Sequence, residues 1–368
     1  MNGIDTARLD TVCARLGDVI TDPAIWPEIL SQISTAVGAT GAVMLQSDVT
    51  TTDVRHSPHS AGMNEILSAY FGSGWHTRDL RAGRGFALLL KGQQVVIDQD
   101  IVTPEEMKRL PFFNEFLAPV GVRWFAGVSV RAGPSLWGAS INRTAREGPF
   151  EATDKRALAY LSQRLTEVAT LSTAVGRIAL SSATNALNAV RQPALAIDRF
   201  GLVLGANSGV EALFDADFLI KNRRLVVQDA AARSCLEKLT DRLRLMPDTA
   251  PIPGEPIVVR RREKSAVIIR VLPIHGAART PFLGARALLV LTTVEPKLRP
   301  TAALLSKAFG LTPAEARLAS IIAEGLSPER AAEELSISKV TARNQLRLIF
   351  EKTDTHRQSE LVALLSRL

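Results

Sequence analysis

The sequence predicts a multidomain protein in which two α+β modules are joined by a helix and followed by an all-α domain of four short helices. Three observations predict this order. Helix and strand patterns alternate through the first 295 residues, an apolar stripe with helical spacing interrupts them, and several helix-start signals follow one another near the C-terminus. We expect a first module at 1–160, a connecting helix at 161–190, a second module at 191–295, a linker at 296–303 and the helical domain at 304–368.

The composition is that of a globular chain. With 368 residues, of which 46% are hydrophobic, the chain is long enough for two or three domains with their own cores. Cys13 and Cys235 form neither a metal-ligand spacing nor a disulfide framework, so we expect a reducing, cytoplasmic location. We expect no signal peptide, because no cationic and apolar leader opens the sequence, and no membrane contact, because no apolar run approaches the roughly 18 residues of a membrane span.

The charge distribution favours a polyanionic partner only locally. The formal net charge is +7, yet the basic excess lies at 176–299, where 19 Lys and Arg stand against 11 Asp and Glu. Residues 338–352 nevertheless carry four basic side chains and one acidic side chain. Such a local imbalance suits the phosphate backbone of a nucleic acid.

The first module shows helical patterns followed by short apolar runs. We expect helices at 4–20 and 26–37, and strands at 42–45, 87–90, 94–97, 125–130 and 137–141. Helices that flank an antiparallel sheet make an α+β domain. The pattern resembles that of GAF domains, including the segment 143–150 that leads into a closing helix, and this resemblance implies a sensory role.

Residues 70–79 form the strongest candidate ligand site of the first module. Tyr70 and Trp75 offer aromatic surface, and Asp79 offers a polar group that would orient a ligand. The segment is faintly similar to the autoinducer-binding domains of LuxR-type regulators, although their Asp-Pro pair is absent. The alternative is that these aromatics close a hydrophobic core. His56, His59 and His76 match no metal cage, so we expect no metal.

The connecting helix carries a stripe of apolar residues at alternating steps of three and four, formed by Leu158, Leu161, Leu165, Val168 and Val175. Two interpretations remain open. The helix packs inside one domain, or it pairs with a second copy and carries a conformational signal towards the C-terminus.

The second module predicts strands at 193–198, 202–206, 257–259, 266–271 and 287–294, and a helix at 230–245. Between the first two strands and this helix, Asn207 is expected to cap a short helix that runs through Phe214. The order strand, turn, strand and Asn-capped helix resembles the opening of PAS domains. The charged turn 260–264 is expected to be solvated rather than bound to phosphate. A single His275 does not predict haem, and we expect no cofactor.

Helix-start signals dominate the last sixty residues. Thr312, Pro313 and Glu315 combine an N-cap hydroxyl, a proline at the first helical position and a carboxylate three residues after the cap. Gly325 is expected to end that helix, and Ser327 and Ser338 repeat the cap. Only a few residues separate the second helix from the third, as a helix-turn-helix requires.

The third helix of this domain presents a polar face. Ala342, Leu346, Ile349 and Phe350 share one stripe, so Arg343, Asn344 and Arg347 are expected to point away from the core. Arginine pairs with guanine and asparagine with adenine in the major groove. Lys339 and Thr341, at the start of the helix, suit phosphate oxygens.

The C-terminal segment resembles the DNA-binding domain of LuxR-type transcriptional regulators. The matching residues include the opening 311–315, the segment 323–327, Ile337-Ser338, Thr341, Asn344 and 349–352, whereas Ala342 and Gln345 depart from the usual valine and histidine. The resemblance implies that helix 338–352 enters the major groove of double-stranded DNA and that 357–368 forms a homodimer contact. A small-molecule effector and RNA polymerase are further partners consistent with such a regulator.

Other classes of function have less support. The sequence contains no phosphate-binding glycine loop and no nucleophile elbow, so we expect no enzyme. A protein-interaction signalling module and a sigma-factor-like DNA reader share the tri-helical core and stay as alternatives.

Overall fold

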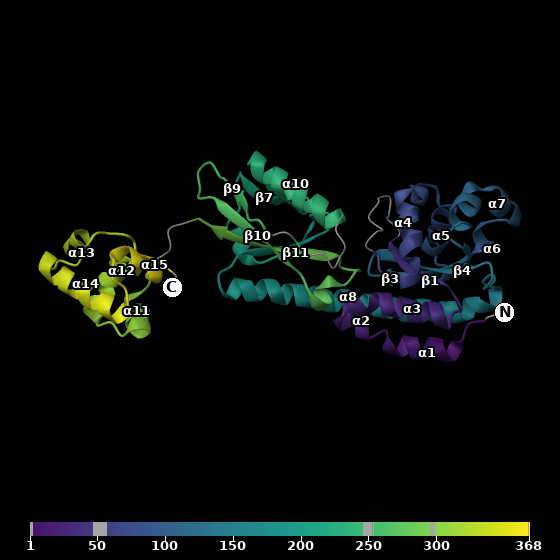
Figure 1. Cartoon of the computed structure of the whole chain (residues 1–368), viewed down its shortest axis with the longest axis horizontal. Helices are drawn as coiled ribbons and strands as arrows, with labels where there is room; N and C mark the ends of the chain where they lie inside the picture. The colour runs from purple at the N-terminus through teal and green to yellow at the C-terminus, as the bar shows by residue number, and fades with distance from the viewer. Residues whose placement is uncertain (1–2, 47–56, 246–251, 253, 295–298, 367) are drawn as a thin grey trace. The chain divides into compact units, whose positions relative to one another are not determined.

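The computed structural model describes residues 3–46, 57–245, 252, 254–294, 299–366 and 368 (Figure 1). The chain divides into two units, Met1–Thr293 and Val294–Leu368. In the described ranges, the first unit contains antiparallel sheets and helices, and the second contains helices alone. Within the described ranges, no helix is long and apolar enough to cross a membrane.

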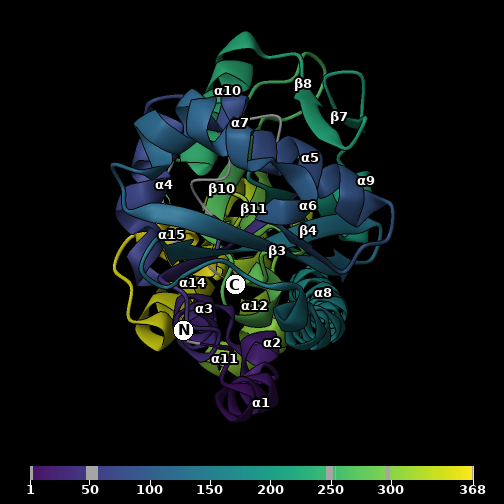
Figure 2. The ribbon, with the colours of Figure 1, turned by 90° about the vertical axis from the view of Figure 1, so that its right-hand side faces the viewer.

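The N-terminal module is built on a four-stranded antiparallel sheet with strand order β1-β4-β3-β2. Helices cover both faces of this sheet (Figure 2). The strands are β1 (Gly41–Gln46), β2 (Val95–Ile97), β3 (Val122–Ala132) and β4 (Ser135–Thr144). One face packs on α1 (Thr6–Arg15), α2 (Asp18–Thr21), α3 (Trp26–Ala36) and α8 (Lys155–Ala189). The other face lies under α4 (Asn64–Gly72), α5 (Leu80–Leu90), α6 (Asp98–Ile101), α7 (Pro104–Arg109) and the π-helical segment η5 (Phe112–Leu117). Short 3-10 turns complete the unit: η1 (Pro23–Ile25), η3 (Ala61–Met63), η4 (Trp75–Arg78), η6 (Ala152–Asp154) and η7 (Gly276–Arg279).

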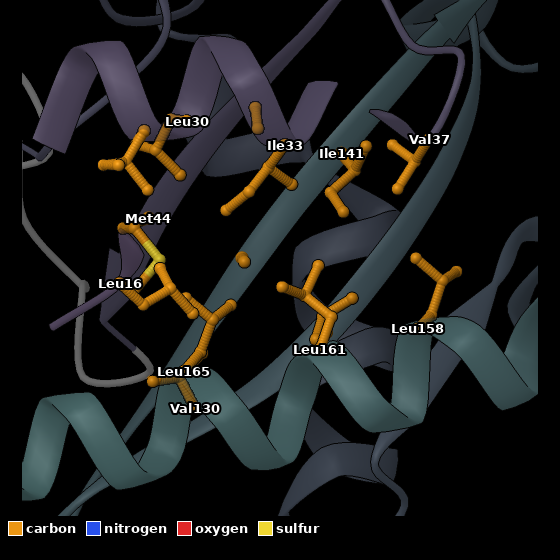
Figure 3. Packing of buried hydrophobic residues seen from close by; sticks show 14 of the residues in the cluster. Leu16, Leu30, Ile33, Val37, Met44, Val130, Ile141, Leu158, Leu161 and Leu165 are labelled. Atoms are coloured by element: carbon orange, nitrogen blue, oxygen red, sulfur yellow. The ribbon is translucent and has the colours of Figure 1, made fainter. Parts of the chain in front are cut away.

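The larger core of this module lies between the sheet and α1, α3 and α8. Leu30 and Ile33 of α3 face Leu161 and Leu165 of α8 across the side chains of the strands, among them Ile141 of β4 (Figure 3). Because side chains alternate along a strand, the neighbouring positions of β3 and β4 point to the opposite face. The two faces of one sheet therefore serve different purposes.

Two sequence predictions for this module are wrong in detail. The helix expected at 4–20 is divided into α1 and α2 at Leu16-Gly17. The strand expected at 87–90 is the end of helix α5, which begins after Asp79, whose side chain accepts a hydrogen bond from Ala82 N. A run of four apolar residues does not distinguish a strand from a buried helix segment, and the Asp79 cap decides in favour of the helix.

Helix α8 belongs to both modules of the first unit. Leu158, Leu161 and Leu165 are fully buried in the N-terminal core, while Leu180 packs against the second sheet. These residues of the stripe are thus covered inside the chain, as expected if the helix packs within the protomer, and pairing with a second copy stays a prediction. Apolar side chains at steps of three and four residues show that one face of a helix is covered, but they do not show which surface covers it.

The second module is a five-stranded antiparallel sheet with order β6-β5-β11-β10-β9. Its strands are β5 (Ala194–Asp198), β6 (Val203–Ala206), β9 (Ile257–Val259), β10 (Val267–Pro273) and β11 (Ala285–Thr293), as expected. Helix α10 (Ala230–Leu245) packs on one face and the C-terminal half of α8 on the other. Short helix α9 (Ser208–Glu211) and a separate hairpin, β7 (Phe218–Lys221) with β8 (Arg224–Val227), lie between β6 and α10 in the sequence.

Several details of the second module differ from prediction. Asn207 precedes α9 without capping it, because its side chain accepts from Ala194 N and donates to Thr184 O and Gln192 O. The helix stops at Glu211 rather than Phe214. The turn at 260–264 is not simply solvated, since the Arg261 side chain is buried and pairs with Asp215 at 3.1 Å.

The hairpin β7–β8 was not predicted. Its two turn residues, Asn222 and Arg223, both have positive φ, as a tight hairpin turn requires. An arginine at the second position conceals the usual Asn-Gly signature of such a turn.

The described residues of the C-terminal unit form five helices rather than the four predicted. They are α11 (Ala302–Phe309), α12 (Pro313–Ile322), α13 (Pro328–Glu334), α14 (Lys339–Thr353) and α15 (Gln358–Leu365). The additional helix α11 begins inside the expected linker 296–303, because Thr301 caps it. Residues 296–298 of that linker lie outside the described residues. Arg299 is described and pairs with Glu324 and Glu334, so the segment before α11 is tied to this unit.

Candidate nucleic-acid interface

The helix starts of the C-terminal unit follow the predicted caps. Thr312 accepts from Glu315 N, and the Glu315 carboxylate accepts in return from Thr312 N at 2.8 Å, which completes the reciprocal cap. Ser327 accepts from Arg330 N, and Ser338 accepts from Thr341 N at 3.0 Å. Three helices are therefore fixed at their first turn by sequence-local hydrogen bonds.

A short turn holds α13 against α14. Four residues, 335–338, separate the two helices, and Ser336 adopts a left-handed φ of 55°. Ala342 and Ile349 are completely buried in a core shared with α12, α13 and α15. This arrangement has the turn length and packing of a helix-turn-helix.

The opposite side of α14 faces outward, as predicted. Arg343, Asn344 and Arg347 are all exposed, together with Lys339 at the start of the helix. They occupy successive turns of one face, because residues three or four apart are neighbours on a helix. The structure thus brings the predicted base-reading residues onto one continuous surface.

Both arginines of this face have weak local partners. Arg343 Nη2 lies 2.8 Å from Glu329 Oε1 of α13, and Arg347 Nη1 lies 3.5 Å from Glu351 Oε1 one turn later. The Arg343 and Arg347 side chains are 70% and 74% exposed. Exposed ion pairs contribute about 0–1 kcal/mol. Phosphate or a base edge can therefore replace Glu329 and Glu351 at little cost.

Two other predicted contacts are already engaged within the unit. The hydroxyl of Thr341 lies 2.8 Å from Ser338 Oγ and supports the cap. Lys352, counted above as part of the basic imbalance, donates to the buried Glu315 at 2.7 Å. Burial favours a raised pKa for Glu315, but the hydrogen bonds from Lys352 and Thr312 outweigh it and hold the pKa below its usual value. Lys352 therefore has a structural role.

Sequence reasoning missed Val340 on this surface. Its side chain is 69% exposed at the second position of α14, between Lys339 and Thr341. N-terminal residues of a recognition helix approach base edges, and an apolar side chain there suits the methyl group of thymine. The sequence feature that could have identified Val340 is an apolar residue on the helix face that is predicted to be polar.

The three candidate ligand residues of the N-terminal module are only partly brought together. Tyr70 Oη donates to Asp79 Oδ2 at 2.7 Å, and both residues line a cavity between the sheet and α4, α5 and η5. Trp75 instead stacks on Phe116, with ring centroids 5.7 Å apart, and does not line the cavity. Trp75 thus closes a core, which was the alternative considered for these aromatics.

Burial determines the protonation of this Tyr70–Asp79 pair. Loss of solvent raises the pKa of Asp79, although the hydrogen bonds from Tyr70 and Ala82 N act in the opposite direction. Burial also raises the pKa of Tyr70, and the neighbouring Asp79 adds to that shift. The pair therefore binds its protons more tightly than the free side chains do.

The acidic, cysteine and histidine side chains do not gather into a metal site in the ranges that the structure describes. Across the described part of the chain, no group of three or more His, Cys, Asp or Glu side chains is arranged to hold a metal ion. His59 bonds to Ser57 O and Asn64 Oδ1, His76 packs against Tyr70 and Phe71, and His56 lies outside the described residues.

Comparisons with known proteins find only weak similarities. The sequence matches no protein-family model and no curated protein. The phage VqmA–DPO complex is 16% identical over 50% of this chain and 87% of that chain, with a TM-score of 0.21. The E. coli DhaR(N)–DhaL complex is 11% identical over 80% of this chain and 92% of that chain, also with a TM-score of 0.21. Similarities this low support no conclusion about the fold or the function of this chain.

Proposed function

We propose that this chain is a DNA-binding transcriptional regulator whose helix α14 reads the major groove. One observation carries the proposal: Lys339, Arg343, Asn344 and Arg347 form an exposed face on the second helix of a helix-turn-helix. The two arginines are held only by exposed ion pairs, so they are free to exchange partners. Asn344 adds an adenine-reading group between two guanine-reading ones.

The sequence resemblance to LuxR-type regulators supports the same role and adds a homodimer that reads two half-sites. Two recognition helices would then enter the groove one helical turn apart. The N-terminal modules supply the input, from a small molecule or a protein, and RNA polymerase is the partner of an activating output. No catalytic step enters this proposal.

Selection of bound sequences from a random duplex library, with the full-length chain, tests the proposal. We expect enrichment of a two-fold motif, and affinity for that motif that falls steeply with salt concentration. Arg347→Ala should weaken specific binding by about 1–3 kcal/mol and relax the preference at one base. The matched control is Arg317→Ala, an exposed arginine on α12 that lies off this face.

The possible outcomes separate the alternatives. Binding without an enriched motif would favour a non-specific DNA reader, and no binding at low salt would favour a protein-interaction module. An unchanged motif and affinity for Arg347→Ala, with a loss for Arg317→Ala, would mean that another face of the unit meets DNA.

A further inference from the structure

We propose that the cavity of the N-terminal module is a binding site for a compact, uncharged, mostly apolar molecule of one ring that carries a single hydroxyl or carbonyl group. The cavity lies over the centre of the β1-β4-β3-β2 sheet, on the face opposite to the larger core. Its role as a ligand site stands on its own residues. Only the effect of a ligand on DNA binding would rest on the proposed function.

The floor of the cavity consists of the smallest side chains of the sheet. Ser140 of β4 pairs with Gly127 of β3 and with Val43 of β1, and Gly138 lies one step further along the same face. Glycine weakens a strand interior, and it often marks a site where a ligand approaches the backbone closely. Two glycines at the middle of one sheet face thus leave room that a regular strand would fill.

Aromatic side chains surround this floor and limit its width. A Cβ atom on Gly138 would lie 3.2 Å from the ring of Phe86, and one on Gly127 would lie 2.8 Å from the ring of Phe125. Phe112 and Phe116 of η5 line the cavity as well. The glycines therefore accommodate the rings of Phe86 and Phe125, and a flat ring is the ligand shape that this aromatic lining favours.

Polar side chains also line this mostly apolar cavity. Asn142 is 7% exposed and lines the cavity, and its Nδ2 donates weakly to Ser140 Oγ at 3.2 Å. Among the described residues, no hydrogen bond reaches Asn142 Oδ1. A ligand hydroxyl can therefore donate to Asn142 Oδ1.

A second polar group is the buried Arg81. Its Nε donates to Asp98 and its Nη2 to Arg123 O, so that within the described part of the chain Nη1 has no hydrogen-bond partner. Arg81 also lines the cavity. A carbonyl or hydroxyl oxygen is a suitable acceptor for this remaining donor.

Charge and size narrow the class of ligand further. The Arg81 charge is already matched by Asp98, so a charged ligand would enter an apolar site without a counter-ion, which is costly. The cavity volume is about 80 Å³, far below the roughly 300–1,000 Å³ of sites for drug-sized ligands. These limits set one ring as the largest ligand and exclude a two-ring or long-chain ligand.

Calorimetric titration of the full-length chain, without DNA, tests the site. The probes are phenol, toluene of nearly the same shape but without a polar group, and benzoate of similar size but charged. We expect phenol to bind about five- to tenfold more tightly than toluene, as one net hydrogen bond implies, and benzoate at least about tenfold more weakly than phenol.

Two substitutions on α5 form a matched pair. Ala82→Leu places a larger side chain in the lining and should lower phenol affinity at least about tenfold, whereas Ala87→Leu, exposed on the same helix, should leave it unchanged. Asn142→Leu should reduce the phenol affinity to that of toluene. Tryptophan fluorescence checks that each variant is folded. If Ala82→Leu does not fold, the phenol affinity of Asn142→Leu tests the site instead.

Three results overturn the proposal. These are no saturable binding of phenol or toluene, phenol binding that Ala82→Leu leaves intact, and benzoate binding tighter than phenol. Loss of DNA binding by the chain would leave all these measurements unaffected, so the two proposals fail separately.

Discussion

Two arginine–carboxylate pairs of this chain have nearly the same geometry in different surroundings. Arg81 Nε lies 2.8 Å from Asp98 Oδ1, and Arg343 Nη2 lies 2.8 Å from Glu329 Oε1. The side chains of the first pair are 4% and 3% exposed, and those of the second pair are 70% and 37% exposed. Distance alone does not distinguish them. Burial makes the first pair a fixed part of the fold and leaves the second free to exchange partners.

The other hydrogen bonds of each pair also indicate that the buried pair is fixed and the exposed pair can exchange partners. Asp98 also accepts from Phe125 N at 2.6 Å, and Arg81 also donates to Arg123 O, so the buried pair links α5 and α6 to β3. The exposed pair joins only α13 to α14, and the further hydrogen bond of Glu329, to the Ser327 side chain, stays at the start of its own helix. A pair that ties several elements together resists replacement, whereas one that ties two neighbouring helices does not.

The largest expected effect comes from breaking the buried pair. Arg81→Met should lower the free energy of unfolding of the first unit by about 3–5 kcal/mol, because Asp98 would remain buried without its partner. Arg343→Met should change the stability of its own unit by less than about 1 kcal/mol. All four tryptophans lie in the first unit, so their fluorescence in denaturant reports on Arg81→Met. The methyl resonances of Ile321 and Ile349, which lie in the C-terminal unit, follow Arg343→Met. Similar losses in both units would break the comparison.

An intermediate effect is expected for the half-buried contact between Lys352 and Glu315. The pKa of Glu315 is lower in the folded chain than its ordinary value of 4.5. Its contribution is therefore complete above about pH 4.5 and is lost as the pH falls through the folded pKa. A charge-assisted hydrogen bond contributes roughly 1.5–3 kcal/mol.

The measurement is the thermal unfolding of the C-terminal unit, followed by methyl resonances of Ile321 and Ile349 in the full-length chain. Glu315→Gln retains the cap acceptor without the charge. It should be less stable than the parent at pH 7, and its stability should fall less than that of the parent between about pH 5 and pH 3. A parent that keeps its full stability at about pH 3 would contradict the pKa assignment.

A smaller effect is expected on removing the charge from the exposed pair. Glu329→Gln should raise the affinity of the chain for duplex DNA by about two- to fivefold at low salt, since it releases Arg343 and removes a carboxylate that repels phosphate. Glu333→Gln, an exposed acid on α13 outside the pair, serves as the control for net charge. Equal gains for both variants would mean that Glu329 acts only through net charge.

The smallest effect expected is that of Val340. Replacing single thymines of the selected site by uracil removes one methyl group at a time, and at one position this should weaken the parent by up to about 0.8 kcal/mol. Val340→Ala should reduce that sensitivity. If uracil scanning gives the same profile for both proteins, Val340 does not touch a thymine methyl group.

The sequence predicts local structure best where a few neighbouring residues decide the conformation. The caps at Thr312, Ser327 and Ser338 form as predicted, because each needs only a hydroxyl and an amide two or three residues away. Prediction fails where distant residues decide. Asn207 has the position of a cap, but α8 and β5 take its side chain.

The candidate sites also differ in whether neighbouring or distant residues determine them. The outward face of α14 follows from helical periodicity within fifteen residues. The cavity could be predicted only in part, since Tyr70 and Asp79 are close in sequence, whereas Arg81 and Asn142 come from separate elements about sixty residues apart. Glycines at 127 and 138 were the remaining signal, and their alignment across β3 and β4 depends on strand register.

Helix α8 has a practical consequence for dissecting the molecule. The first half of this helix completes one hydrophobic core and the second half completes another. A fragment that stops at residue 160 or begins at residue 191 therefore lacks the helix that covers its core. We expect such fragments to expose apolar residues and to aggregate. The workable place to cut is near residue 294, where the helix and both of its sheets remain on one polypeptide.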